Sequence, residues 1–122
     1  MTQKILIVDD SKAMRLIVRR TLRQAGFGGC EIEEAADGQQ ALAQIERFQP
    51  TMVLSDWNMP QMNGYELLQE IGARKLSVRF GFVTTEGTPE MRARAMEAGA
   101  LFLIIKPFTP EQFQEVLTPL LA

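Results

Sequence analysis

The chain has 122 residues, of which 46% are hydrophobic and 23% charged, values typical of one globular domain with a single core. The formal net charge of −2 argues against nucleic acid as the main partner, because no basic face dominates. With no histidine and one cysteine, the chain lacks the residues for a Ser-His-Asp or Cys-His hydrolase, a histidine phosphocarrier, an internal disulfide or a typical zinc site.

No apolar run approaches the roughly 18 residues that are needed to span a bilayer. The first residues pass at once into a strand-like segment, so we expect no signal peptide. We therefore predict a cytoplasmic protein without membrane insertion.

The first unit of the chain is an apolar run followed by a helical pattern. Residues 4–8 predict a strand buried on both faces, and the strand ends at Asp9-Asp10. Ser11 is a good helix N-cap, and Gly26–Gly29 ends the helix that follows. The arginines that lie off its apolar stripe are assigned to a solvated face: Arg15, Arg19, Arg20 and Arg23.

The same pattern recurs through the chain. Further strands are predicted at 31–35, 52–54, 80–83 and 101–105, and the glutamates of the 31–35 segment suit a sheet edge. Helices should begin after the N-cap residues Asp37, Asn63, Thr88 and Thr109. Pro119 should end or bend the last helix.

Five strand–helix units without a linker predict an α/β fold in which helices cover both faces of a parallel sheet. Because the weakly apolar second strand belongs at an edge, we predict a flavodoxin-like, doubly wound sheet of order 2-1-3-4-5 with five helices. The switch point of such a sheet lies between strands one and three. One domain should cover residues 1–122, with no output domain after it.

Polar residues follow four of these strands, and parallel strands end at one edge of a sheet. The residues expected to meet there are Asp9, Asp10, Asp56, Thr84 and Lys106. Each has an ordinary alternative role as a loop, cap, strand-end or surface residue. Their common position in separate strand–helix units favours a shared site over coincidence.

Three carboxylates and one lysine leave an excess of two negative charges, which a divalent cation would offset. Mg2+ suits such a site, with Asp9, Asp10, Asp56 and the Asn58 carbonyl as its ligands. Asp56 could then attack a phosphoryl group. Lys106 and the Thr84 hydroxyl would stabilise the phosphoryl oxygens.

Four segments together resemble the receiver domains of two-component response regulators, and the resemblance extends along essentially the whole chain. They are Ile-Leu-Ile-Val-Asp-Asp (5–10), Asp-Trp-Asn-Met-Pro-Gln-Met-Asn-Gly (56–64), Val-Thr-Thr-Glu (83–86) and Lys-Pro-Phe (106–108). Single-domain regulators of chemotaxis are the most similar members. The resemblance implies a phosphorylation switch rather than a turnover enzyme, with a histidine kinase as phosphodonor and a role in chemotaxis or motility control.

The resemblance also implies individual roles. Asp56 would be the phosphoacceptor, Thr84 would turn toward the phosphoryl group, and Lys106 would contact it. The Lys106–Pro107 bond would be cis, and Asn58 and Glu86 would tune dephosphorylation so that the phosphorylated state is fairly short-lived. The output surface would be formed by the fourth helix, fifth strand and fifth helix of a monomer.

One position departs from the family pattern. Where a switching Tyr or Phe is usual, three residues before the lysine, this chain has Leu103. The neighbouring Phe102 should point to the other side of the strand. We hypothesise that output depends less on an aromatic flip and more on movement of the loop 84–89. The alternative is that Leu103 only packs beneath the fourth helix.

Three other functions stay open at this point. A phosphorylation-independent receiver-like binding module is kept open by Leu103. An aspartyl-nucleophile phosphohydrolase would usually have an acid where Asn58 stands. A flavin-binding module of the same fold is disfavoured, because an acidic edge would repel the cofactor phosphate.

Overall fold

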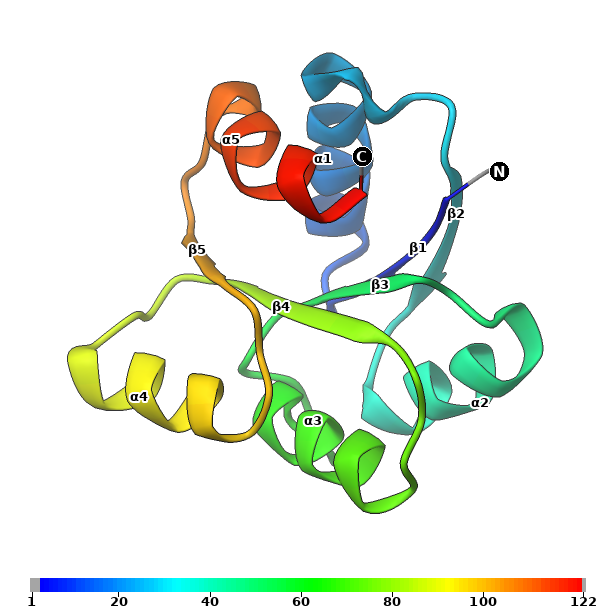
Figure 1. The fold of residues 1–122 in the computed structure, drawn as a ribbon, viewed down its shortest axis with the longest axis vertical. Helices are drawn as coiled ribbons and strands as arrows, with labels where there is room; N and C mark the ends of the chain where they lie inside the picture. Colours follow the sequence, from blue (N-terminus) through cyan, green and yellow to red (C-terminus); the bar gives the residue numbers. More distant parts are fainter. Residues whose placement is uncertain (1–2, 122) are drawn as a thin grey trace.

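A parallel sheet lies at the centre of the molecule (Figure 1). The structure is a computed structural model that describes residues 3–121. The strands lie in the predicted order β2-β1-β3-β4-β5, and each neighbouring pair runs parallel. Their bounds are β1 (Lys4–Val8), β2 (Glu31–Ala35), β3 (Met52–Ser55), β4 (Arg79–Thr84) and β5 (Leu103–Ile105).

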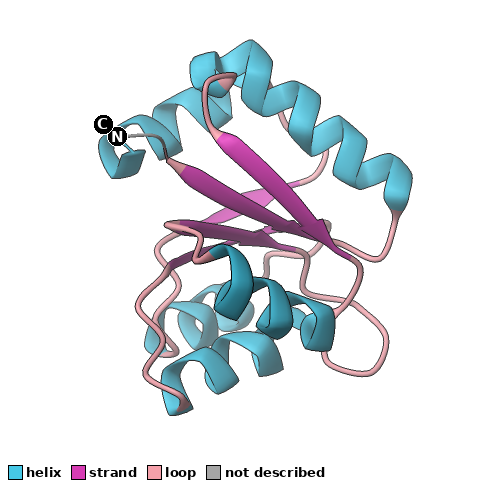
Figure 2. Cartoon of the chain, turned by 90° about the vertical axis from the view of Figure 1, so that its right-hand side faces the viewer, coloured by secondary structure: helices cyan, strands magenta, loops and turns pink. Residues whose placement is uncertain are grey.

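Helices cover both faces of this sheet, so the predicted doubly wound architecture is confirmed (Figure 2). One face carries α1 (Lys12–Leu22), its continuation η1 (Arg23–Phe27) and α5 (Pro110–Leu121). The other face carries α2 (Gly38–Phe48), α3 (Gly64–Ala73) and α4 (Pro89–Glu97). Among residues 3–121, no helix has the length and apolar character that crossing a membrane requires.

Each helix begins where its capping residue predicts, which keeps the loops after the strands short. Asn63 accepts a hydrogen bond from the Glu66 amide at 2.8 Å, and Glu66 accepts one from the Asn63 amide at 3.0 Å. This reciprocal pair is the predicted capping box at the start of α3. Ser11, Asp37, Thr88 and Thr109 likewise accept amide hydrogen bonds at the starts of the other four helices.

The two faces of the sheet hold separate apolar clusters, and the first residue of β5 and the residue before it belong to different ones. Phe102 packs with the side chains under α1 and α5, whereas Leu103 packs with those under α3 and α4. The Phe102 ring lies over Gly81, where a Cβ atom would come within 2.0 Å of the ring. The expected placement of Phe102 and Leu103 on opposite sides is therefore confirmed.

β3 and β4 lie within one residue of their predicted bounds, and two other boundaries differ more. β5 begins at Leu103 rather than at 101, and the Leu101 side chain is 46% exposed. The sequence predicts that Pro119 ends or bends the last helix. α5 continues through Pro119 to Leu121, so the helix does not end there. Proline removes one amide donor, and so close to the helix end few hydrogen bonds are affected by its loss.

Candidate functional site

The backbone carries the first and third strand ends to the same edge. The amide of Asp56 donates to the carbonyl oxygen of Val8 at 2.9 Å, and the amide of Asp9 donates to that of Ala35 at 3.1 Å. Pairing between strands therefore extends one residue beyond β1 and β3. Because β1 and β3 flank the switch point of the sheet, the two aspartates meet in its crevice.

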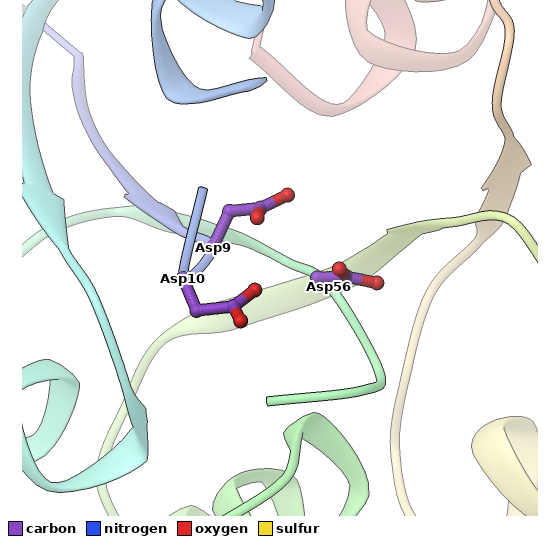
Figure 3. A group of neighbouring side chains, drawn as sticks. All are labelled: Asp9, Asp10 and Asp56. Atoms are coloured by element: carbon purple, nitrogen blue, oxygen red, sulfur yellow. The ribbon is translucent and has the colours of Figure 1, made fainter. Parts of the chain in front are cut away.

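Three carboxylates lie together at this edge (Figure 3). One oxygen each from Asp9, Asp10 and Asp56 lies within 4.8 Å of the others. Asp9 is buried, Asp56 is half-buried and Asp10 is exposed, so the group is anchored inside and open to solvent on one side. An all-oxygen donor set of this kind fits Mg2+, which binds a few carboxylates and retains several waters.

Lys106 is the cation that the structure places against these carboxylates. Its Nζ lies 2.9 Å from Asp9 Oδ2 and 3.3 Å from Asp56 Oδ2, with only 9% of the side chain exposed. The amide of Lys106 donates to the carbonyl oxygen of Thr84 at 2.8 Å. This bond places the lysine at the same edge of the sheet, beside the end of β4. The Lys106–Pro107 bond is cis, as the sequence resemblance implies.

Thr84 brings a hydroxyl group to the same edge. Its side chain is fully buried, and within the part of the chain that the structure describes its Oγ1 has no hydrogen-bond partner. A buried hydroxyl without a partner costs about 1–3 kcal/mol. Among residues 3–121, the end of β4 therefore carries a buried hydroxyl whose hydrogen-bonding capacity is unused.

The loop that carries Asp56 closes tightly on itself. Asp56 Oδ1 accepts a hydrogen bond from the Trp57 amide at 2.7 Å, and the Gly64 amide donates to the Trp57 carbonyl at 2.8 Å. A Cβ atom at Gly64 would lie 2.1 Å from the Asp56 carbonyl oxygen. Only glycine lets the two backbone segments approach so closely, and this contact holds the start of α3 against Asp56.

The loop after β4 begins at the same edge of the sheet, because parallel strands end there together. Glu86 is exposed, as is Asn58 in the loop after β3. Gly87 packs against β5, because a Cβ there would lie 2.2 Å from Ile105 Cδ1 and 3.0 Å from Leu103 Cδ2. Leu103 is buried, so the loop rests on an aliphatic surface.

A stack of rings connects the Asp56 loop to α4. The Trp57 ring lies 4.6 Å from the Phe82 ring and 5.4 Å from the Tyr65 ring, centroid to centroid. On α4, the Arg94 guanidinium lies 4.7 Å from the centroid of Tyr65. This stack is not predictable from periodicity in the sequence, because its members come from different elements.

Two arginines assigned to a solvated face instead form an ionic cluster beside the carboxylates, so that assignment is wrong for them. Arg15 Nε lies 2.8 Å from Glu34 Oε1, and Arg19 Nη2 lies 2.8 Å from Glu34 Oε2. Arg15 Nη1 also donates to the Asp9 carbonyl oxygen at 2.6 Å. Burial alone would raise the pKa of Glu34, but the hydrogen bonds and charges of both arginines outweigh it and lower the pKa.

A sequence signal for this cluster does exist. Arg15 and Arg19 are four residues apart, so they share one side of α1, and β2 is the strand that follows that helix. The other two arginines of the set, Arg20 and Arg23, are exposed as predicted.

Comparison with known proteins gives a consistent result. Residues 5–118 match the family model of the response regulator receiver domain. The chain is 38% identical over 117 residues to chemotaxis protein CheY1 of Helicobacter pylori, covering 93% of each chain. It is 39% identical over 121 residues to a CheY homologue of Campylobacter jejuni, covering 97% of this chain and 92% of the relative.

A solved structure agrees with these relatives. The chemotaxis protein CheY4 of Vibrio cholerae superposes with a TM-score of 0.87 at 35% identity, covering 99% of this chain and 100% of that one. The sheet order, the acidic edge and the family match over almost the entire chain agree with one another. The chain belongs to the receiver domains of two-component response regulators and is a CheY-like member of that family.

Proposed function

We propose that Asp56 accepts a phosphoryl group from a kinase phosphohistidine in a Mg2+-dependent reaction, and that phosphorylation switches the binding of a protein target. The observation that carries this proposal is the meeting, at one sheet edge, of three carboxylates with Lys106 and the unpartnered Thr84 hydroxyl. Such a set has an acceptor, a cation and a donor for one phosphoryl group.

In the transfer step, an Asp56 carboxylate oxygen attacks phosphorus. The new O–P bond forms as the P–N bond to the donor imidazole breaks, and the imidazole leaves with that electron pair and gains a proton. Asp9, Asp10, Asp56 and the Asn58 carbonyl would hold Mg2+, which when bound supplies positive charge next to the phosphoryl oxygens.

Lys106 and Thr84 would stabilise the product. The Lys106 ammonium already contacts the Asp56 carboxylate, so only a short movement brings it to an attached phosphoryl oxygen. The Thr84 hydroxyl would donate to another oxygen and thereby gain the partner that it lacks. Water then hydrolyses the acyl phosphate, with the exposed Asn58 and Glu86 tuning its rate, and the carboxylate is restored.

The conformational output would pass through the loop 84–89. Turning the Thr84 hydroxyl toward the phosphoryl group pulls on this loop, whose Gly87 rests on Leu103 and Ile105. Leu103 is already buried, which supports loop movement rather than a ring flip as the readout. Structures with and without a phosphoryl analogue such as beryllium trifluoride test this; an unchanged loop would refute it.

The partners follow from the same proposal. The phosphodonor would be a histidine kinase, and the protein target would bind the face formed by α4, β5 and α5 of a monomer. The CheY-like character of the chain supports a role in chemotaxis or motility control.

Incubation with Mg2+ and acetyl phosphate, followed by intact-mass measurement, tests the central claim. We expect one phosphoryl adduct on the wild-type chain and none on Asp56→Asn, which keeps the size of the side chain but removes the nucleophile. An Asp10→Asn variant, assayed across Mg2+ concentrations, should need more Mg2+ for the same yield.

The alternatives give different results in the same assay. A wild-type chain without adduct, at any Mg2+ concentration, would favour a phosphorylation-independent binding module. Continued turnover of small phosphomonoesters without an accumulating adduct would instead favour a phosphohydrolase.

A further inference from the structure

The Arg15 guanidinium joins the metal-site loop to a neighbouring strand. Its Nη1 donates to the Asp9 carbonyl oxygen at 2.6 Å, while its Nε donates to Glu34 Oε1 on β2 at 2.8 Å. Only 15% of the side chain is exposed. This is a fixed, largely buried bridge rather than a surface ion pair.

The bridge completes the hydrogen bonding of Asp9. The Asp9 amide donates to Ala35, its Oδ1 accepts from the Ser11 amide at 2.9 Å, and its Oδ2 accepts from Lys106 at 2.9 Å. The bond from the Asp9 amide to Ala35 is the last one between β1 and β2, so the Asp9 carbonyl oxygen lies beyond the paired part of the two strands. Arg15 provides the partner that a strand would otherwise supply.

Glu34 and Arg19 hold that guanidinium in place. Arg19 donates to Glu34 Oε2 through Nε at 3.1 Å and through Nη2 at 2.8 Å, so both carboxylate oxygens of Glu34 are engaged. Glu34 thus has little freedom to rotate away from Arg15. A planar guanidinium with donors in a fixed fork can reach a carboxylate and a carbonyl together, which a lysine ammonium does less well.

We propose that Arg15 is a positioning residue for the Mg2+ site: it fixes the backbone at Asp9, and so the Asp9 and Asp10 carboxylates, in the geometry that binds the ion. This inference rests on the proposed function, because it takes Mg2+ as the ion of the acidic group. Residues that orient metal ligands typically change metal affinity by about 10–100-fold when they are replaced.

A purely electrostatic role and a positioning role for Arg15 predict opposite changes in Mg2+ affinity when Arg15 is substituted. Removing a positive charge near three carboxylates reduces repulsion toward Mg2+, so a purely electrostatic role predicts tighter binding after substitution. Loss of a positioning bond predicts weaker binding. The direction of the change therefore separates the two roles.

The test compares Arg15→Met with Arg19→Met in the full chain. Both variants keep an apolar stem and lose one positive charge from the Glu34 cluster, but only Arg15 contacts Asp9. Mg2+ binding is measured with MgCl2 and no phosphodonor, by the fluorescence of Trp57, which follows Asp56, and by titration calorimetry. We expect Arg15→Met to bind Mg2+ about tenfold more weakly. Arg19→Met should lose much less affinity, because Arg15 keeps its own bonds to Glu34 and to the Asp9 carbonyl.

A second readout distinguishes positioning from general damage. Raising the Mg2+ concentration should restore much of the phosphorylation by acetyl phosphate that Arg15→Met loses at low Mg2+, since its defect lies in affinity. Arg15→Gln carries the same predictions with a polar side chain, in case the methionine variant does not fold. Circular dichroism melting checks that each variant is folded.

Each outcome has a definite meaning. Wild-type or tighter Mg2+ binding by a folded Arg15 variant would overturn this inference and leave the proposed function intact. Equal weakening in Arg15→Met and Arg19→Met would also overturn it. A wild-type chain that does not bind Mg2+ in either assay would overturn both.

Discussion

The two walls of the acidic crevice are built differently. On the side of α1 and β2, Arg15, Arg19 and Glu34 form a network of short ionic hydrogen bonds that reaches the Asp9 backbone. On the side of β4 and α4, Thr84 has a hydroxyl without a partner among the described residues 3–121, and Gly87 rests on aliphatic side chains. One wall is tied by directional bonds, and the other is held mainly by non-directional packing.

This difference suits the two tasks of a receiver domain. Metal ligands need a fixed geometry, which the ionic wall supplies. A switching segment needs two arrangements of similar energy, and packing without directional bonds permits both. The following three predictions test whether the walls differ as described.

The largest loss of stability should come from substituting a glycine in the sheet, Gly81, rather than one in the loop 84–89, Gly87. Gly81→Ala places a Cβ 2.0 Å from the buried Phe102 ring, so we expect a loss of about 1–3 kcal/mol in urea denaturation. Gly87→Ala meets Ile105 and Leu103 side chains, but its loop can shift, so the loss should be smaller. Phe102→Leu should partly rescue Gly81→Ala. Equal losses at the two glycines would mean that the loop is as rigid as the strand.

Thr84→Val should make the resting protein more stable. Valine keeps the shape of threonine and removes a buried hydroxyl that has no partner within residues 3–121, so we expect a gain of about 1 kcal/mol. Thr84→Ser, the control, keeps the hydroxyl and loses a methyl group, and it should be destabilised. We also expect Thr84→Val to lose the change in hydrogen exchange that acetyl phosphate induces in the loop 84–89. A destabilised Thr84→Val would show that the hydroxyl is satisfied in the resting state.

The smallest effect is a pH dependence of the ionic wall. Because Arg15 and Arg19 lower the pKa of Glu34, its carboxylate stabilises the fold at pH values above the unfolded pKa of about 4.3. That contribution should be lost as the pH falls through the lower, folded value. The stability difference between wild type and Glu34→Gln should then be constant near pH 7, below about 1 kcal/mol, and vanish in acid.

Urea denaturation at a series of pH values measures this difference. Glu33→Gln is the matched control: it removes a carboxylate from the same strand, and Glu33 forms a more exposed ion pair, with Arg47 of α2. If the Glu34→Gln difference were the same at every pH, the ionic wall would not depend on the Glu34 charge.

The elements of the fold were predictable because their signals are local. Capping residues such as Asn63 define helix starts by bonding to amides two or three positions away, and apolar runs such as 4–8 define buried strands. Once the strand order follows from the weak second strand, the meeting of Asp9 and Asp56 follows from topology alone. The alternation that separates Phe102 from Leu103 is equally local.

Contacts between elements were not predictable in the same way. Whether Arg15 points to water or to Glu34 depends on how α1 lies across β2, and periodicity along α1 says nothing about that. The ring stack of Trp57, Tyr65 and Phe82 likewise depends on three separate elements. The outcome at Pro119 was unpredictable for a different reason: whether a proline ends a helix depends on how many helical residues follow it, and here α5 continues only to Leu121.

The tight closure at Gly64 has a consequence for how this chain tolerates changes of length. Since the Gly64 backbone lies against the Asp56 carbonyl, the segment 56–64 has no slack, and an added or deleted residue would displace the acidic group itself. The turn after η1 is different: a Cβ at Gly29 would meet nothing within 4 Å, and this turn precedes β2, at the end of the sheet opposite to the three carboxylates. Tags and inserted peptides therefore belong in that turn, where extra chain leaves the acidic edge undisturbed.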